Sequence, residues 1–102
     1  MFKPMGTEKT SSGMQMIKEL NYEGALAAFD EAQAQAENSR LIDRGRGIAY
    51  MGLTDYEQAI LSFRSSLESS DGLIQEMDFD VNYYLAVAYI KSGQPQNAKE
   101  VY

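Results

Sequence analysis

The sequence contains no histidine and no cysteine among its 102 residues. Without histidine, no imidazole is available as a general base, a metal ligand or a pH switch near neutrality, which excludes most hydrolase and metalloenzyme sites. Without cysteine there are no disulfides, no thiolate zinc sites and no thiol nucleophiles. We therefore predict that the protein is not an enzyme, uses no cofactor and binds no metal ion.

Basic residues and long apolar runs are also scarce. Nine lysines and arginines stand against fifteen acidic residues, a net charge of −6, and this sign disfavours a nucleic acid partner. No apolar run approaches the ~20 residues of a membrane-spanning helix, so no membrane insertion is expected. The first ten residues lack the apolar core of a secretory signal. Because Tyr102 ends the chain within an apparent helix, we expect a fragment; cytoplasmic localisation is only the default, and an exported form stays open.

An internal repeat is the main feature that the sequence does contain. An aromatic residue, an alanine and a second aromatic residue recur 34 residues later: Tyr22, Ala25 and Phe29, then Tyr56, Ala59 and Phe63. A fixed period of this size indicates stacked helical units, each of which buries its apolar face against its neighbours. The length and the 44% hydrophobic content suffice for one such domain.

Two kinds of helix alternate in this pattern. In residues 21–36, and again 34 residues later, apolar residues fall on one side and polar residues on the other, which predicts a helix with one buried face. Asn21 and Asp55 precede these helices and are suited to cap them. Residues 41–53 are apolar on two sides, which is typical of an inner layer. Each unit therefore pairs an inner and an outer helix, antiparallel across a short turn.

A third unit begins after a longer interval, because Tyr89 follows Tyr50 by 39 residues instead of 34. The added residues predict a turn at 69–72 and an inner helix that is lengthened backwards towards Leu73. Residues 81–90 also alternate as a strand would, but their match to the earlier inner helix favours a helix.

This pattern of small and aromatic residues resembles the tetratricopeptide repeat family. The matching positions are Gly13, Met16, Tyr22, Ala25, Phe29 and Ala32 in unit one, Gly47, Tyr50, Tyr56, Ala59, Phe63 and Ser66 in unit two, and Ala86, Tyr89, Ala98 and Tyr102 in unit three. The resemblance implies an all-α fold of helix-turn-helix repeats stacked as a right-handed superhelix, with about five helices and a truncated sixth. One domain, residues 1–102, would contain repeat 1 at about 7–38, repeat 2 at about 40–70 and a truncated repeat 3 at about 73–102.

The resemblance also implies where a partner binds. In the family, the free face of the inner helices lines a concave groove for an extended peptide or a partner helix. Carried onto this sequence, the groove consists of Met14, Ile17, Lys18, Arg44, Ile48, Met51, Tyr83, Val87, Ile90 and Lys91. It is mostly apolar with three cations, which favours an apolar segment or helix with acidic residues. The family's clamp for a C-terminal carboxylate is not matched, because Thr10, Met14 and Gly45 stand at its positions.

Two local motifs have alternative interpretations. Residues 78–82 carry the alternating oxygen ligands of a calcium loop, but Tyr83 stands where that loop needs glycine. Gly45 and Gly47 suggest a phosphate loop, but they lie inside an inner helix and no helix start follows them. We interpret the first motif as the acidic start of a helix and the second as glycines that allow close packing.

The predicted function is a non-catalytic protein-interaction module that binds a peptide or helix in the groove. The alternative is a structural segment of a larger assembly, which associates with itself through its groove or end faces. A homo-oligomer through the truncated C-terminal end is expected in that case, because the apolar side of Tyr84, Leu85 and Ala88 would lack the cover of a complete outer helix. The sequence pattern does not name the protein or peptide partner.

Overall fold

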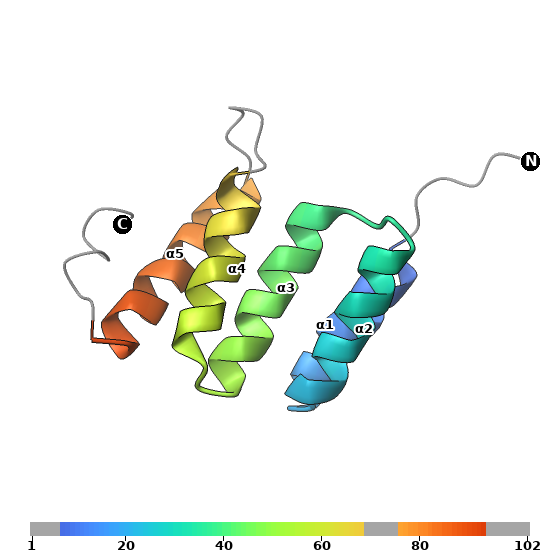
Figure 1. The fold of residues 1–102 in the computed structure, drawn as a ribbon, viewed down its shortest axis with the longest axis horizontal. Coiled ribbons are helices and arrows are strands. Elements are labelled where there is room, and N and C mark those ends of the chain that lie inside the picture. The colour runs from blue at the N-terminus through green and yellow to red at the C-terminus, as the bar shows by residue number, and fades with distance from the viewer. Residues whose placement is uncertain (1–6, 69–75, 94–102) are drawn as a thin grey trace, which may run out of the picture.

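The computed structural model describes residues 7–68 and 76–93, which form five α-helices (Figure 1). The helices are α1 (Glu8–Lys18), α2 (Tyr22–Ala34), α3 (Ser39–Gly52), α4 (Tyr56–Glu68) and α5 (Glu76–Lys91). The predicted all-α class is confirmed, as is the helix over residues 81–90. The turn at 69–72, the extension to Leu73 and the sixth helix after residue 93 lie outside the described residues. The repeat boundaries and the handedness of the stack stay predictions.

The helices form two layers. Helix α3 contacts both α1 and α5, while α2 packs against α1 and α3, and α4 packs against α3 and α5. The inner layer is therefore α1, α3 and α5, and the outer layer is α2 and α4. Successive helices reverse direction, so the three inner helices run parallel to one another (Figure 1). The predicted pairing of inner and outer helices is confirmed.

Each inner helix ends in the same backbone conformation. Leu20 after α1 and Thr54 after α3 are left-handed, with φ of 62° and 59°, and Gly93 after α5 has φ of 86°. The amides of Asn21 and Asp55 then donate to the carbonyl five residues earlier, at 2.8 Å and 2.9 Å. These bonds satisfy carbonyls at the end of the helix and turn the chain sharply. The repeat is thus present in the backbone as well as in the side chains.

The two residues that close these turns also start the next helix. Oδ1 of Asn21 accepts a hydrogen bond from the Gly24 amide at 3.0 Å, and Oδ1 of Asp55 accepts one from the Gln58 amide at 3.3 Å. Both predicted caps are confirmed. Because one residue serves both helices, the inner and outer helices are joined with almost no intervening chain.

The core between units is built around aromatic rings that lie on glycines. Phe29 of α2 is fully buried and its ring lies over Gly13 of α1 and Gly45 of α3. A Cβ on Gly13 would stand 2.5 Å from Cε1 of the ring, closer than carbon atoms can approach. A Cβ on Gly45 would meet the same Phe29 ring. Gly45 is therefore a packing glycine, as predicted.

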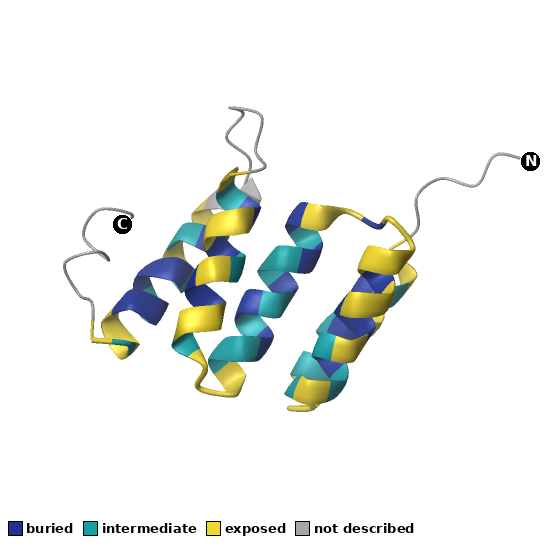
Figure 2. Cartoon of the chain, in the orientation of Figure 1, coloured by how far each residue is buried: buried dark blue, intermediate teal, exposed yellow. Residues whose placement is uncertain are grey.

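Phe63 of α4 occupies the equivalent place in the next unit. It lies over Gly47 and stacks on Tyr84 of α5, with ring centroids 5.7 Å apart. Leu85 and Ala88 of α5 are 1% and 0% exposed and belong to the same buried cluster. Figure 2 shows buried residues along α5. The prediction that these residues lack cover is wrong, because α4 of the preceding unit packs against them.

Candidate functional site

The apolar groove residues predicted on α1 pack partly against the hydrophobic core, whereas the cation is exposed. Met14 and Ile17 are half-buried and pack against the cluster that contains Phe29. Lys18 lies in the last turn of α1 and is exposed. Helix α1 therefore adds a partly apolar margin with one cation to the inner face.

On α3 the apolar groove residues are half-buried and the cation is neutralised. Ile48 and Met51 pack against the cluster shared by α4 and α5. Arg44 bonds through Nε, at 2.8 Å, and through Nη2 to Oδ2 of Asp80 on α5. The predicted set of three available cations is thus wrong for Arg44, because its charge links α3 to α5. Lys18 and Lys91 are the predicted cations that remain exposed.

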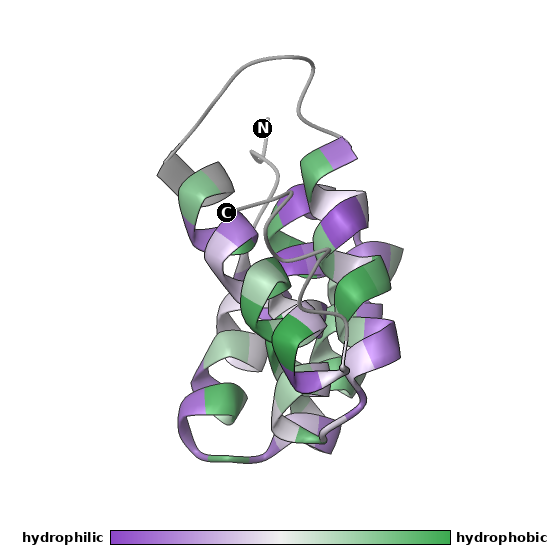
Figure 3. Cartoon of the chain, turned by 90° about the vertical axis from the view of Figure 1, so that its left-hand side faces the viewer, coloured by the Kyte–Doolittle hydropathy of each residue, from purple (hydrophilic) through white to green (hydrophobic). Residues whose placement is uncertain are grey.

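Helix α5 carries the most exposed part of the face. Phe79, Tyr83 and Ile90 are 68%, 51% and 58% exposed, and Val87 is half-buried. Their spacing of four, four and three residues places them on one side of the helix. We call these four residues the α5 stripe; Figure 3 views the molecule from this end of the stack. Phe79 is not among the predicted groove residues, although it lies one turn before Tyr83.

The described residues contain neither a metal-binding cluster nor a membrane-spanning helix. In the part of the chain that the structure describes, no three acidic, histidine or cysteine residues are grouped so as to hold a metal ion. Asp80, which belongs to the calcium-like motif, accepts the bonds from Arg44 instead. None of the helices within residues 7–68 and 76–93 is long and apolar enough to cross a membrane.

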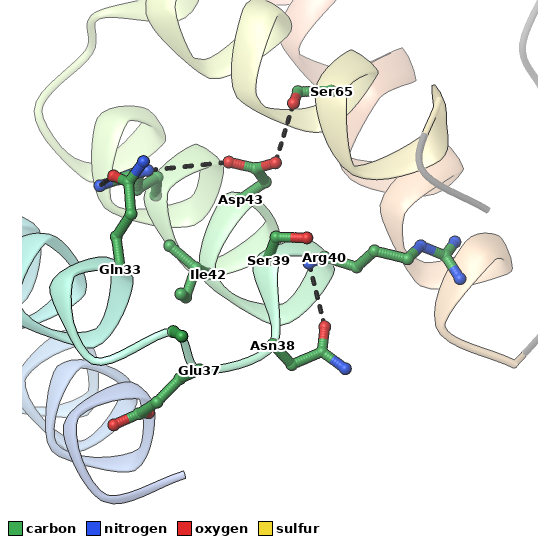
Figure 4. Close-up of a pocket in the computed structure, with 10 residues that line it drawn as sticks. Gln33, Glu37, Asn38, Ser39, Arg40, Ile42, Asp43 and Ser65 are labelled. Atoms are coloured by element: carbon green, nitrogen blue, oxygen red, sulfur yellow. Dashed lines mark hydrogen bonds and ion pairs between the residues drawn. The ribbon is translucent and has the colours of Figure 1, made fainter. Parts of the chain in front are cut away.

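A separate hollow of about 630 Å³ opens between α2, α3 and α4 (Figure 4). It is lined by Gln33, Ala36, Glu37, Asn38, Ser39, Arg40, Ile42, Asp43, Arg46 and Ser65. Several of its polar groups form hydrogen bonds across helices. Nη2 of Arg46 donates to Asp30 at 2.8 Å and to Gln33 at 2.6 Å, while the Ser65 hydroxyl donates to Asp43 at 2.8 Å. These bonds hold α2, α3 and α4 together.

Glu37, at the rim of this hollow, points towards α1 and caps its first turn. Its carboxylate accepts bonds from the Lys9 amide at 3.1 Å and from the Thr10 amide and hydroxyl at 2.9 Å and 2.7 Å. Burial alone would raise the pKa of Glu37, but the Thr10 and Lys9 bonds and the Lys9 charge outweigh it, so the pKa is lowered. Thr7, the residue before α1, makes no side-chain cap.

Comparison with known families agrees with this architecture. A family model described as a tetratricopeptide repeat matches residues 80–102, which include α5 from Asp80 onwards. Residues 80–102 are therefore similar to a tetratricopeptide repeat, which supports the resemblance found in the residue pattern. Neither curated proteins nor solved structures gave a match. Repeats of this family generally serve as protein-interaction modules and are generally not enzymes.

Proposed function

We propose that the protein is a non-catalytic interaction module whose inner face, formed by α1, α3 and α5, binds an apolar helix or extended segment of a partner protein. The observation that carries this proposal is the α5 stripe, in which three large apolar side chains are more than half exposed. Covering one such side chain fully contributes about 1.5–3 kcal/mol. A contiguous exposed stripe of this kind is typical of an interaction surface.

The rest of the inner face supports the same proposal. Met14 and Ile17 of α1 and Ile48 and Met51 of α3 are half-buried, so they add partly exposed apolar side chains to the inner face. Methionine side chains adapt to partners of different shape. Lys18 and Lys91 lie in the last turns of α1 and α5, at one end of the parallel inner helices. An acidic residue of the partner would be favoured at that end.

The test is a selection of binding peptides from a displayed random library against the purified chain, followed by titration of a selected peptide into two variants. Ile90→Glu places a charge in the α5 stripe, and we expect it to weaken binding by about tenfold or more. Leu61→Glu is the matched control, because Leu61 lies on the outer helix α4 and is 60% exposed against 58% for Ile90. It should leave binding unchanged.

Circular dichroism must show that both variants remain helical. If Leu61→Glu weakens binding as much as Ile90→Glu, the peptide does not use the inner face and the assignment is wrong. If no displayed peptide binds the folded chain, the proposed module function fails as well.

A further inference from the structure

The α5 stripe is complementary to itself when two copies of α5 run in opposite directions. We propose that α5 pairs with α5 of a second copy of the chain, antiparallel and about a two-fold axis. This inference rests on the proposed function only in that both use the exposed side of α5. Its occupant is specific: another molecule of the same protein, seated on the stripe.

One register aligns every part of the stripe. In an antiparallel pair of identical helices, two residues that face each other have residue numbers that add up to the same value along the whole interface. That sum is 169 for Phe79 with Ile90 and 170 for Tyr83 with Val87. The two values differ by one residue, a rise of about 1.5 Å along a helix. All four members of the stripe therefore meet apolar partners at once, and the two-fold axis doubles each contact.

The charges agree with the same register. Asp80 and Lys91 are eleven residues apart, so they lie on the same flank of α5. In an antiparallel pair related by a two-fold axis, each flank of α5 lies against the same flank of the other copy, as it does in antiparallel coiled coils. The sum for Asp80 with Lys91 is 171, so the lysine of one copy approaches the carboxylate of the other. Both described bonds from Arg44 end on Oδ2 of Asp80, which leaves Oδ1 to accept from the lysine.

The pairing should be reversible. A single helix face is a small interface, and each copy carries a net charge of −6, which repels the other copy at long range. We therefore expect a dimer that forms as concentration rises through the micromolar to millimolar range. A peptide bound to α5 would compete with the second copy, so partner binding and dimer formation exclude each other on this helix.

Sedimentation equilibrium of the whole chain, without any peptide, tests the dimer. The unmodified chain should change from monomer to dimer with concentration, and Ile90→Glu should raise the dissociation constant by about tenfold or more. Leu61→Glu should dimerise as the unmodified chain does. A chain that stays monomeric up to millimolar concentration overturns the proposal, as does a dimer that only Leu61→Glu disrupts.

Disulfide cross-linking tests the direction and register. The chain has no cysteine of its own, so single Tyr83→Cys and Val87→Cys variants each carry one thiol. In an equimolar mixture under mild oxidation, the mixed disulfide between positions 83 and 87 should dominate. A preference for disulfides that join position 83 to 83 and position 87 to 87 indicates parallel helices and overturns the register.

The two proposals fail separately. A chain that remains monomeric but binds selected peptides through the inner face overturns the dimer and leaves the interaction module intact. A chain that dimerises through α5 but selects no peptide supports the dimer and overturns the proposed module function.

Discussion

Glu37 caps α1 from a position 27 residues beyond Thr10, through two bonds to the backbone amide and the hydroxyl of that residue. Glu37 lies directly before Asn38, which caps α3 through Arg40 and Leu41. Two adjacent residues of the α2–α3 turn therefore fix the starts of two inner helices. This link holds the first helix pair in register with the next unit, in addition to the apolar core.

Replacing Glu37 with glutamine should lower the midpoint of chemical unfolding at neutral pH, because an amide oxygen accepts these bonds less strongly than a carboxylate. The lowered pKa sets the pH dependence. A group whose pKa is depressed on folding stabilises the protein above its unfolded pKa, about 4.3. That stability is lost as pH falls through the folded pKa. The deficit of Glu37→Gln should therefore shrink in acid.

Glu31→Gln is the control for this prediction. Glu31 pairs with Lys9 at 3.1 Å, but its side chain is 59% exposed, so its removal should change the midpoint little at any pH. Unfolding curves at several pH values between neutral and acid compare the two variants. Equal deficits for both, or a Glu37→Gln deficit that grows as pH falls, would contradict the cap.

The helix pairs could be predicted from the sequence because their causes are local or repeated. Asn21 and Asp55 cap helices that begin at the next residue, and Phe29 and Phe63 recur with the period of the stack. The bond between Glu37 and Thr10 has no such signal. It joins residues 27 positions apart, and no spacing rule connects a turn carboxylate to a distant helix start.

The inner face could be placed only by family resemblance, and its availability could not be predicted. Arg44 is predicted as a cation for a ligand because its partner, Asp80, lies 36 residues away along the chain, and no sequence pattern joins the two residues. Leu85 and Ala88 are predicted to lack cover because the outer helix that follows them is truncated, whereas the preceding α4 packs against them. Exposure depends on the packed neighbours, which sequence periodicity does not specify.

Gly47→Ala should destabilise the protein by about 1 kcal/mol. Forcing a methyl group against the buried Phe63 ring costs about 1–3 kcal/mol, and the better helix propensity of alanine returns about 1 kcal/mol. Urea unfolding measures the net change. Adding Phe63→Leu to Gly47→Ala should cost less than the two single effects combined, because the ring that meets the methyl group is gone. If the two effects are strictly additive, contact with the Phe63 ring is not the reason that a side chain at position 47 is unfavourable.

Leu20→Gly should stabilise the protein by about 0.5–1 kcal/mol. Leu20 is 72% exposed and holds a φ of 62°, a conformation that costs a residue with a side chain about 1–2 kcal/mol. Glycine removes that cost but adds about 0.5–1 kcal/mol of chain entropy to the unfolded state. Leu53→Gly is the matched control, because Leu53 is also exposed but has φ of −85°. The midpoint temperature of thermal unfolding should rise for Leu20→Gly and fall for Leu53→Gly. A change of the same sign in both variants would contradict backbone strain at Leu20.

The pair of Arg44 and Asp80 should have a measurable coupling energy, because it bridges two inner helices and both side chains are largely shielded, at 22% and 38% exposure. A double-mutant cycle with Arg44→Gln and Asp80→Asn should give about 0.5–1 kcal/mol, decreasing with added salt. The cycle for Arg46 and Asp30 uses the same residue types, but Asp30 is 75% exposed, so its coupling should be smaller. Equal couplings would mean that the link between α3 and α5 contributes no more than a surface ion pair. In that case the placement of α5, and with it the exposed stripe, depends on the apolar packing of α5 against α3 and α4.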